Sequence, residues 1–287
     1  MDLGPIEARL AEAILRASTH IPEDVERALA RGLDQETTDI ARSQLRAMLD
    51  NVAIARDEAR PICQDTGIVS FYLTAGYDFP ALGRIVRALE NVLVGATRDI
   101  PLRPNTSHPL RAANPGNNTG PFMPVVDVVF VEGDQLVIDV LPKGGGSENC
   151  SGLFLLTPAE GIKGFRKRLV DHVQKAGGKP CPPLVLGVGV GSPADLALRL
   201  AKRSLTRPLG EHNADPEIAQ LERDMLADVN ALGIGPNGLG GRTTALDVHV
   251  EVTYRHPASY PVAVAVQCWA DRRARVIVDK NLHAALS

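Results

Sequence analysis

Residues 180–204, PCPPLVLGVGVGSPADLALRLAKRS, join an uncharged apolar run to a segment with helical periodicity. Because the run PLVLGVGV is short, apolar and preceded by prolines, it predicts a strand that is buried on both faces. The spacing of apolar residues from Pro193 to Ser204 then predicts a helix. A buried strand that leads straight into a helix is typical of an α/β (α+β) fold.

Similar patterns extend in both directions along the chain. Helical periodicity runs to about residue 60, where Pro61 ends it, and further helices are predicted at 82–96, 158–176 and 216–232. Further strands are predicted at 67–74, 245–254, 262–267 and 275–278. We therefore expect an N-terminal helical region, 1–60, followed by a mixed α/β domain, 61–287. With 287 residues, 44% of them hydrophobic, the chain has enough core for both to form one structural domain.

Two stretches in the first half depart from simple periodicity. Residues 98–124 are polar and rich in proline and asparagine, and so long a segment without periodicity is a candidate active-site loop. The runs VVDVVFV (125–131) and QLVIDVL (135–141) are separated by a short turn sequence and predict a β-hairpin. The second run leads into three glycines, 144–146, which allow the backbone to approach a ligand closely.

The charge balance excludes some classes of partner. The chain has 31 basic and 34 acidic residues, a net charge of −3, and no basic run, so we expect no nucleic-acid partner. Its first residues lack the basic start and apolar run of a signal peptide, and no apolar span is long enough for a membrane. We expect a cytoplasmic protein whose four cysteines are free, metal-bound or reactive rather than disulfide-paired.

Three of the four cysteines lie where regular structure is interrupted. Cys181 stands in Pro180-Cys181-Pro182-Pro183, Cys63 precedes the turn-forming string Gln64-Asp65-Thr66-Gly67, and Cys268 follows a predicted strand. A lone cysteine is usually a small buried hydrophobe. Three thiolates on separate loops, however, suit an iron–sulfur cube with one iron left open as a Lewis acid. Cys150, which follows the glycines, is interpreted as a spare thiol.

Two other features have ordinary structural explanations. Gly187, Gly189 and Gly191 resemble a phosphate-binding turn, but their spacing lacks the dinucleotide fingerprint and no P-loop lysine follows. We favour glycines that let a helix pack on the strand, with Ser192 as the helix cap. Taken alone, His256 is more often structural than catalytic.

Six motifs together resemble a known family. They are ICQDTG (62–67), NTGPFMP (118–124), PKGGGSEN (142–149), PCPP (180–183), GIGPNGLGG (233–241) and CWADRR (268–273). In this combination and order the chain resembles the class I, iron–sulfur-dependent fumarate hydratases and their L(+)-tartrate dehydratase relatives. The resemblance covers the α subunit, or the N-terminal catalytic region of single-chain members. It implies a separate β subunit that completes the active site, in an α2β2 assembly.

The resemblance also implies roles for individual residues. Cys63, Cys181 and Cys268 correspond to the ligands of a 4Fe-4S cluster, and Asp65 to an acid in proton transfer, with Gln64 beside it. Arg103 corresponds to an arginine that binds a substrate carboxylate, Gly146 to a backbone amide donor to the substrate, and His256 to an active-site histidine. Further lining residues implied in the same way are Asn118, Thr119, Lys143, Ser147 and Asn149.

The expected activity is that of a hydro-lyase. The resemblance implies reversible hydration of fumarate to L-malate, and Ser147 directly after the glycines favours fumarate, because tartrate dehydratases tend to carry a cysteine there. L(+)-tartrate or a related 2-hydroxy diacid is the alternative substrate. Readings from other classes are a non-catalytic cluster-binding protein and a nucleotide-binding module, and the same thiols would also suit a zinc site.

Overall fold

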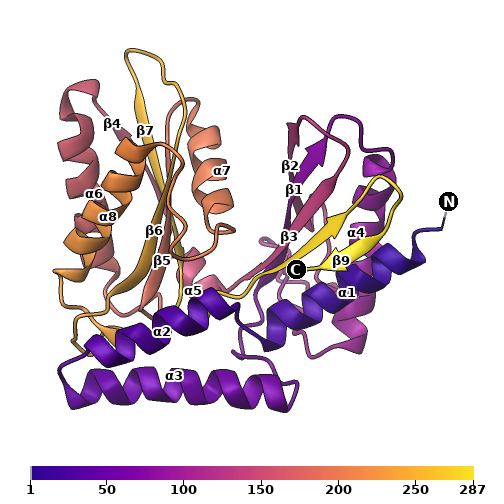
Figure 1. Cartoon of the computed structure of the whole chain (residues 1–287), viewed down its shortest axis with the longest axis horizontal. Coiled ribbons are helices and arrows are strands. Elements are labelled where there is room, and N and C mark those ends of the chain that lie inside the picture. Colours follow the sequence, from indigo (N-terminus) through magenta and orange to yellow (C-terminus); the bar gives the residue numbers. More distant parts are fainter. Residues whose placement is uncertain (1) are drawn as a thin grey trace. The chain divides into compact units, whose positions relative to one another are not determined.

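The computed structural model describes residues 2–287 and divides the chain into two units, each built from separate stretches of sequence (Figure 1). The first unit comprises residues 2–22, 52–145 and 272–287, and the second comprises residues 23–51 and 146–271. Both units combine helices with a mixed sheet, which confirms the predicted α/β class. The predicted organisation, helices at 1–60 on a domain at 61–287, stays a prediction.

The first unit is a five-stranded sheet with two long helices. Its strand order is β2 (Val125–Val131), β1 (Ile68–Gly76), β3 (Leu136–Lys143), β8 (Ala274–Val278) and β9 (Ala284–Leu286). Helix α1 (Gly4–Thr19) packs on α4 (Leu82–Asp99) and on β3, β8 and β9. Leu10 and Ile14 of α1, Phe71 of β1 and Leu89 of α4 are fully buried in one apolar cluster.

The predicted hairpin at 125–141 is wrong. Strands β2 and β3 do not pair with each other, because β1 lies between them, parallel to β2 and antiparallel to β3. The turn at 132–135 therefore crosses the end of β1, a span of two strand spacings, or roughly 10 Å. Gly76 permits this crossing, since a Cβ there would lie 2.2 Å from the carbonyl oxygen of Gly133. The local pattern predicted both strands but could not reveal a third strand between them.

The second unit is a four-stranded sheet with helices on both faces. Its order is β4 (Gly152–Leu156), β7 (Tyr260–Gln267), β5 (Leu184–Val190) and β6 (Ala245–Val252). In Figure 1, α6 (Gly161–Ala176) and α8 (Pro216–Asn230) lie along one face and α7 (Ala194–Ser204) along the other. Helix α2 (Glu23–Gln35) also contacts β6. Strands β4 and β9 were not predicted, because both are short and lack alternation.

Smaller elements complete the chain. Helix α3 (Asp39–Asp57) contains one of the points at which the chain passes from one unit to the other, and α5 (Gly145–Glu148) is a single turn built on the predicted glycine segment. Two short 3-10 helices lie at Pro158–Glu160 and Pro236–Gly238. Residues 100–124 contain no helix or named strand, as the sequence predicts for this loop.

Strand β5 is buried along its whole length, as expected. Leu184, Leu186 and Val188 face the cluster formed with α6 and α8. Gly187 and Gly189 face α7, and a Cβ on them would lie 2.1 and 2.0 Å from carbonyl oxygens of that helix. The packing explanation for these glycines is therefore confirmed, but Ser192 is not the helix cap, because its hydroxyl bonds to that of Ser259 instead.

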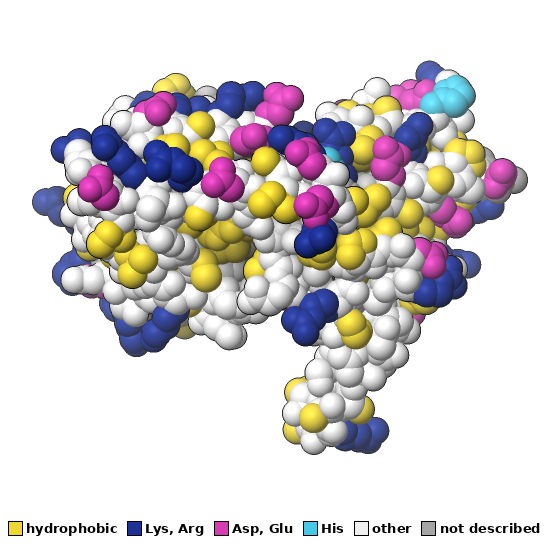
Figure 2. Space-filling view, turned by 90° about the horizontal axis from the view of Figure 1, so that it is seen from below, with side chains coloured by type: hydrophobic (Ala, Val, Ile, Leu, Met, Phe, Trp, Pro, Cys, Tyr) yellow, Lys and Arg dark blue, Asp and Glu magenta, His cyan; other side chains and the backbone are white. Residues whose placement is uncertain are grey.

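The charged surface is mixed. In Figure 2, basic and acidic side chains are interspersed over the face shown, with hydrophobic atoms between them. Among residues 2–287, no helix combines the length and apolar character needed to cross a bilayer.

Replacing Gly189 with alanine should destabilise the second unit. The added methyl would overlap the Ala197 carbonyl oxygen of α7, and forcing helix and strand apart costs about 1–3 kcal/mol or more. Urea unfolding followed by circular dichroism measures this loss. The control is Gly95→Ala in α4, where a Cβ meets nothing within 4 Å and should stabilise the helix by about 0.5–1 kcal/mol. Equal effects of the two substitutions would contradict the packing explanation.

Candidate active site

The turn at 62–67 is fixed through Asp65. The carboxylate of Asp65 accepts hydrogen bonds from the backbone N–H of Gly67 (3.0 Å) and of Gly145 (2.7 Å). The Asp65 carbonyl oxygen accepts a third, from Nη2 of Arg272 at 3.0 Å. At the start of the turn, buried Ile62 donates its N–H to the Ser18 carbonyl. A carboxylate held on both oxygens by backbone groups has a defined orientation, which a proton-transferring group requires.

Arg103 lies beside this turn. Thr66 is fully buried, and its hydroxyl accepts from the backbone N–H of Arg103 (3.0 Å) and from the Asn105 side chain (3.1 Å). The exposed Arg103 guanidinium donates to the Gln64 carbonyl at 3.2 Å. The structure thus brings Gln64, Asp65 and Arg103 together in the first unit.

Asn118 and Thr119 form hydrogen bonds within this loop. Buried Asn118 accepts from the Asn105 backbone N–H at 2.6 Å and donates to Thr97 Oγ1 and to the Arg103 carbonyl. Its φ of 61° is in the left-handed region, which asparagine tolerates better than most residues. The Thr119 hydroxyl donates to Asn117. Both residues were predicted to line the site, and in the structure both polar groups are engaged within the loop.

The glycine segment approaches Asp65 most closely at Gly144. A Cβ on Gly144 would lie 2.9 Å from Asp65 Oδ2, whereas one on Gly146 would meet only the Lys179 carbonyl at 3.9 Å. Packing within the chain thus requires a glycine at 144, and it places no such requirement on Gly146. Lys143 is buried at the end of β3, buried Ser147 donates to the Gln267 side chain at 3.4 Å, and Asn149 is exposed.

Two of the predicted ligand cysteines lie at neighbouring strand ends in the second unit. Cys181 precedes β5 and Cys268 follows β7, and these strands are antiparallel partners with Val185 opposite Gln267. The backbone N–H of Trp269 donates to the Cys181 carbonyl at 3.1 Å, which ties the two ends together. Cys181 is exposed with a φ of 55°, in the left-handed region, and Cys268 is half-buried.

The 233–241 loop supports Cys181 from the other side. Asn237 donates its backbone N–H to the Pro182 carbonyl at 2.7 Å, and Gly238 packs against Gly178 so closely that a Cβ would lie 2.5 Å from its Cα. The carboxylate of buried Glu36 in turn accepts the N–H groups of Arg242 and Thr243. Three of the motifs quoted above therefore meet around one cysteine.

The remaining cysteines differ from each other. Cys63 is half-buried in the first unit, whereas Cys150 is buried in the apolar cluster of the second unit and its carbonyl bonds to His172. Within residues 2–287, no three or more His, Cys, Asp or Glu side chains form a group that could hold a metal ion. The donors that the chain offers at Cys181 and Cys268 are sulfur, which suits iron–sulfur clusters or zinc rather than Mg²⁺ or Ca²⁺.

His256 does not lie near Cys181 and Cys268. It is exposed on the loop between β6 and β7, where its Nδ1 accepts from the backbone of Ala258. This loop is at the start of β7, and Cys268 is at the end of that eight-residue strand, roughly 25 Å away. The loop projects from the top of the second unit in Figure 1. A sequence pattern alone cannot show which end of a sheet a loop occupies.

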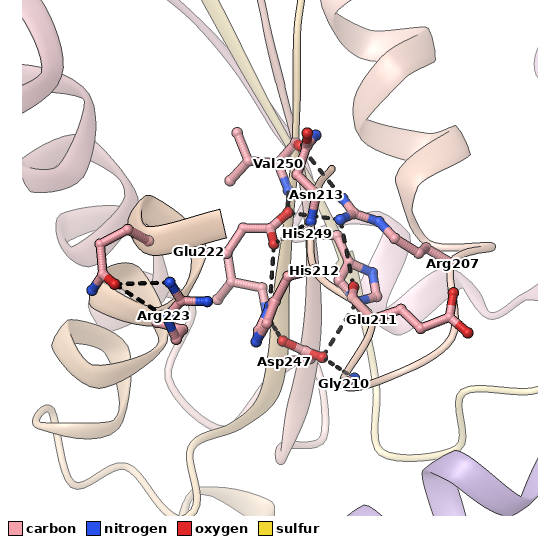
Figure 3. Close-up of polar contacts among 12 residues, drawn as sticks. Arg207, Gly210, Glu211, His212, Asn213, Glu222, Arg223, Asp247, His249 and Val250 are labelled. Atoms are coloured by element: carbon pink, nitrogen blue, oxygen red, sulfur yellow. Dashed lines mark hydrogen bonds and ion pairs between the residues drawn. The ribbon is translucent and has the colours of Figure 1, made fainter. Parts of the chain in front are cut away.

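Sequence reasoning missed a buried charge network in the second unit (Figure 3). Glu222 is buried and accepts from Arg207, His212 and the backbone of Asn213 and Val250. Arg207 also bonds to Glu251 of β6, at 3.1 Å. On the same strand, Asp247 lies 3.3 Å from His249. The alternation of Asp247, His249 and Glu251 with apolar residues was the available signal, because it marks one polar face of β6.

The pKa values of two carboxyl groups on this face, Asp247 and Glu251, are shifted in opposite directions. Burial alone would raise the pKa of Asp247, but His249 and the backbone N–H groups of Gly210 and Val248 outweigh it, so this pKa is lowered. Burial raises the pKa of Glu251, helped by the nearby charge of Glu222, although Arg207 opposes the shift. Asp247 therefore stabilises the fold in its ionised form.

Comparisons with known proteins agree with this arrangement of motifs. The sequence model of the family described as fumarate hydratase (Fumerase) matches residues 7–277. A protein of Methanocaldococcus jannaschii named "Putative L(+)-tartrate dehydratase subunit alpha" is 42% identical over 280 residues, which cover 95% of this chain and 98% of that protein. The L(+)-tartrate dehydratase subunit alpha of Escherichia coli O157:H7 is 36% identical over 266 residues, 92% of this chain and 88% of that protein. The protein of Escherichia coli K12 with the same name is 35% identical over the same length.

By its fold the chain is an α/β protein, with two cysteines at neighbouring strand ends of one sheet and a carboxylate oriented by backbone N–H groups. The chain belongs to the fumarate hydratase family, as the motif resemblance predicted. This is a family of iron–sulfur-dependent hydro-lyases.

Asp247 gives a pH-dependent prediction. Because its pKa is lowered in the folded chain, its contribution is present above the unfolded pKa of about 3.9 and is lost as the pH falls through the folded pKa. Asp247→Asn should therefore cost about 1–3 kcal/mol of unfolding free energy at neutral pH and less at strongly acidic pH. Urea unfolding at a series of pH values measures both. A cost that does not change with pH would contradict the assignment.

Proposed function

We propose that this chain is the α subunit of an iron–sulfur hydro-lyase that dehydrates a four-carbon 2-hydroxy diacid, with L(+)-tartrate as its substrate. The observation that supports this most is the match to α subunits of that name over 92–95% of the chain, combined with Cys181 and Cys268 at adjacent strand ends. Loss of water from L(+)-tartrate leaves the enol of oxaloacetate. Loss of water from L-malate by the same step would leave fumarate.

The proposed cofactor is a 4Fe-4S cluster with Cys63, Cys181 and Cys268 as ligands. The strand pairing of β5 and β7 supports Cys181 and Cys268, and the motif resemblance supports Cys63 in the first unit. Such a cluster supplies a Lewis-acidic iron for the substrate's hydroxyl and carboxylate oxygens. Cys150 stays outside this set, because it is buried in the apolar cluster. A cofactor that needs reduced cysteines also supports a cytoplasmic location.

The side chains of the first unit have distinct proposed roles. Arg103 binds a substrate carboxylate, since its guanidinium is exposed and offers parallel donors to two carboxylate oxygens. Asp65 transfers a proton at the departing hydroxyl, because its carboxylate is held by backbone groups within the same turn as Cys63. Gln64, which is exposed and stands between Cys63 and Asp65 in the sequence, contacts the substrate. Gly146 is proposed as a backbone donor, and Lys143, Ser147 and Asn149 as neighbours of the substrate.

A separate β subunit is part of the proposal. The relatives are named as α subunits, and this chain matches 88–98% of their length. We propose an α2β2 assembly in which the β subunit supplies the remaining catalytic groups. His256, which is far from the cysteines of its own unit, has a catalytic role in this scheme only if another chain brings a substrate to it.

Fumarate and L-malate are the second candidate pair. Ser147, which directly follows the three glycines, favours them, whereas the names of the relatives favour tartrate. Because the two hydroxy acids differ by one hydroxyl group, the comparison of their turnover decides the assignment.

The decisive experiment is anaerobic reconstitution of the chain with its β subunit, iron and sulfide, followed by parallel assays of L(+)-tartrate, L-malate and fumarate. We expect a brown protein with visible absorbance and a kcat/KM that is highest for L(+)-tartrate. A colourless, iron-free preparation that still dehydrates the acid would overturn the proposed cofactor. A higher kcat/KM for L-malate would replace tartrate with the second pair.

Two matched cysteine variants serve as controls for the ligand assignment. Cys181→Ser should abolish both the visible absorbance and turnover, because serine is a poor ligand for iron in such clusters. Cys150→Ser should leave both in place, since that thiol is buried in the core and lies outside the ligand set. The opposite pattern would show that the ligands are assigned to the wrong cysteines.

Arg103→Lys tests carboxylate binding. A lysine ammonium keeps the charge but not the planar pair of donors, so we expect KM to rise by roughly tenfold, with a smaller effect on kcat. The matched control is Arg111→Lys, an exposed arginine of the same loop, which should leave KM unchanged. Steady-state kinetics of the reconstituted enzyme measure both. If the two variants behave alike, Arg103 does not bind the substrate.

A further inference from the structure

Arg272 is an unusual arginine in this chain. The residue is 1% exposed, and among the described residues it has the largest side chain that is fully buried. It lies in the CWADRR motif, four residues after Cys268 and just before β8. One of its nitrogens, Nη2, donates to the Asp65 carbonyl at 3.0 Å. Its Nε and Nη1 have no hydrogen-bond partner within residues 2–287.

Three partly buried arginines of the chain are paired with carboxylates. Arg207 contacts Glu222 and Glu251, Arg166 contacts Asp224 and Asp228, and Arg275 contacts Asp139. Arg272 has a backbone carbonyl as its acceptor, which carries a partial charge only. Among residues 2–287, no carboxylate therefore pairs with Arg272, although its guanidinium is more deeply buried than those of the other three arginines.

A buried guanidinium without an anionic partner lowers the stability of the folded chain. A guanidinium keeps its proton at all ordinary pH values, so it cannot escape burial by becoming neutral. A buried charge without a counter-charge destabilises a fold, and buried N–H groups without acceptors add to this cost. An anion that accepts from Nε and Nη1 would remove both penalties at once.

The location of Arg272 indicates where that anion belongs. Its one bond is to the carbonyl of Asp65, whose carboxylate is fixed by Gly67 and Gly145 in the turn that begins at Cys63. The guanidinium therefore lies at the backbone of the proposed proton-transfer residue. Both kinds of anion that the proposed reaction needs, cluster sulfur and substrate carboxylate, belong to this site.

We propose that Arg272 is an anion-binding residue of the active site: one N–H group positions the Asp65 turn, and the other donors bind an anionic acceptor that arrives with the cofactor or the substrate. This rests on the proposed function. The acceptor is either a sulfur of the cluster or a carboxylate oxygen of the diacid, and the two sources share the same chemistry. An arginine that only supports the fold would need no such acceptor.

The test compares Arg272→Met in the full chain without cofactor and in the anaerobically reconstituted αβ enzyme. Methionine fills similar space without charge, so in the cofactor-free chain the loss of one hydrogen bond is offset by the removal of an uncompensated buried charge. We expect its thermal midpoint to be unchanged or raised. In the reconstituted enzyme we expect the same substitution to lower the midpoint, because a bound anion has lost its partner.

Two further readouts identify the anion. If the acceptor is a cluster sulfur, Arg272→Met shifts the visible spectrum and the reduction potential of the cluster and leaves KM near its normal value. If the acceptor is a substrate carboxylate, the spectrum stays unchanged and KM rises by roughly tenfold or more. The proposal is overturned if the variant is destabilised equally with and without cofactor while spectrum, potential and KM all stay at wild-type values.

Control variants keep the result interpretable. Arg275→Met removes a nearby arginine that pairs with Asp139, so it should lower the thermal midpoint equally in both states and leave the spectrum and KM unchanged. Should Arg272→Met fail to fold, Arg272→Lys replaces it, because it keeps the charge and loses the directed donors. A lysine variant identical to wild type in spectrum, potential and KM would then overturn the proposal. A wild-type enzyme without iron or activity would instead count against the proposed function.

Discussion

The antiparallel pairing of β5 with β7 is the constraint on which the candidate site of the second unit depends. Because Val185 lies opposite Gln267, the residues just before β5 and just after β7 must be neighbours, and these residues are Cys181 and Cys268. The bond from Trp269 to the Cys181 carbonyl continues the pairing beyond the sheet. A one-residue slip would turn every side chain of β7 to the other face, and the buried core on both faces of these strands prevents it.

In the first unit, hydrogen bonds from backbone N–H groups fix the positions of the candidate site residues. Asp65 is oriented by two amides and Arg103 by the hydroxyl of Thr66, so neither position depends on a flexible surface contact. This explains why the 62–67 motif contains small and turn-forming residues. Gly67 has a φ of 81°, and a Cβ there would lie 2.7 Å from the carbonyl carbon of Lys143. The close approach of two backbone segments therefore requires glycine at the end of this motif.

Local sequence patterns predicted the main helices and strands. They could not predict strand order, because strand order depends on pairing between segments that are distant in the sequence. The buried strand at 184–190 and the helices at 194–204 and 216–230 follow from apolar spacing, and all three are present. The supposed hairpin failed because strand order depends on β1, which is some 50 residues earlier in the chain. Similarly, the sequence singles out both Cys181 and Cys268, but their position at neighbouring strand ends follows only from the sheet register. Arg272 was overlooked because burial of an arginine leaves no signature in composition or periodicity.

Discrimination between tartrate and malate depends on which polar side chains can still form a hydrogen bond with the substrate. A site that reads an extra hydroxyl needs a donor or acceptor that is unsatisfied when that hydroxyl is missing. Asn118 already uses both ends of its amide within the loop, and the Thr119 hydroxyl is bonded to Asn117. Neither side chain has an N–H or O–H donor left for the second hydroxyl of tartrate. Gln64 and Arg103 are both exposed, and the proposed function places both against the substrate, but a guanidinium suits a carboxylate better than a hydroxyl. Under the proposed function, Gln64 is therefore better suited than Arg103 to distinguish the two acids.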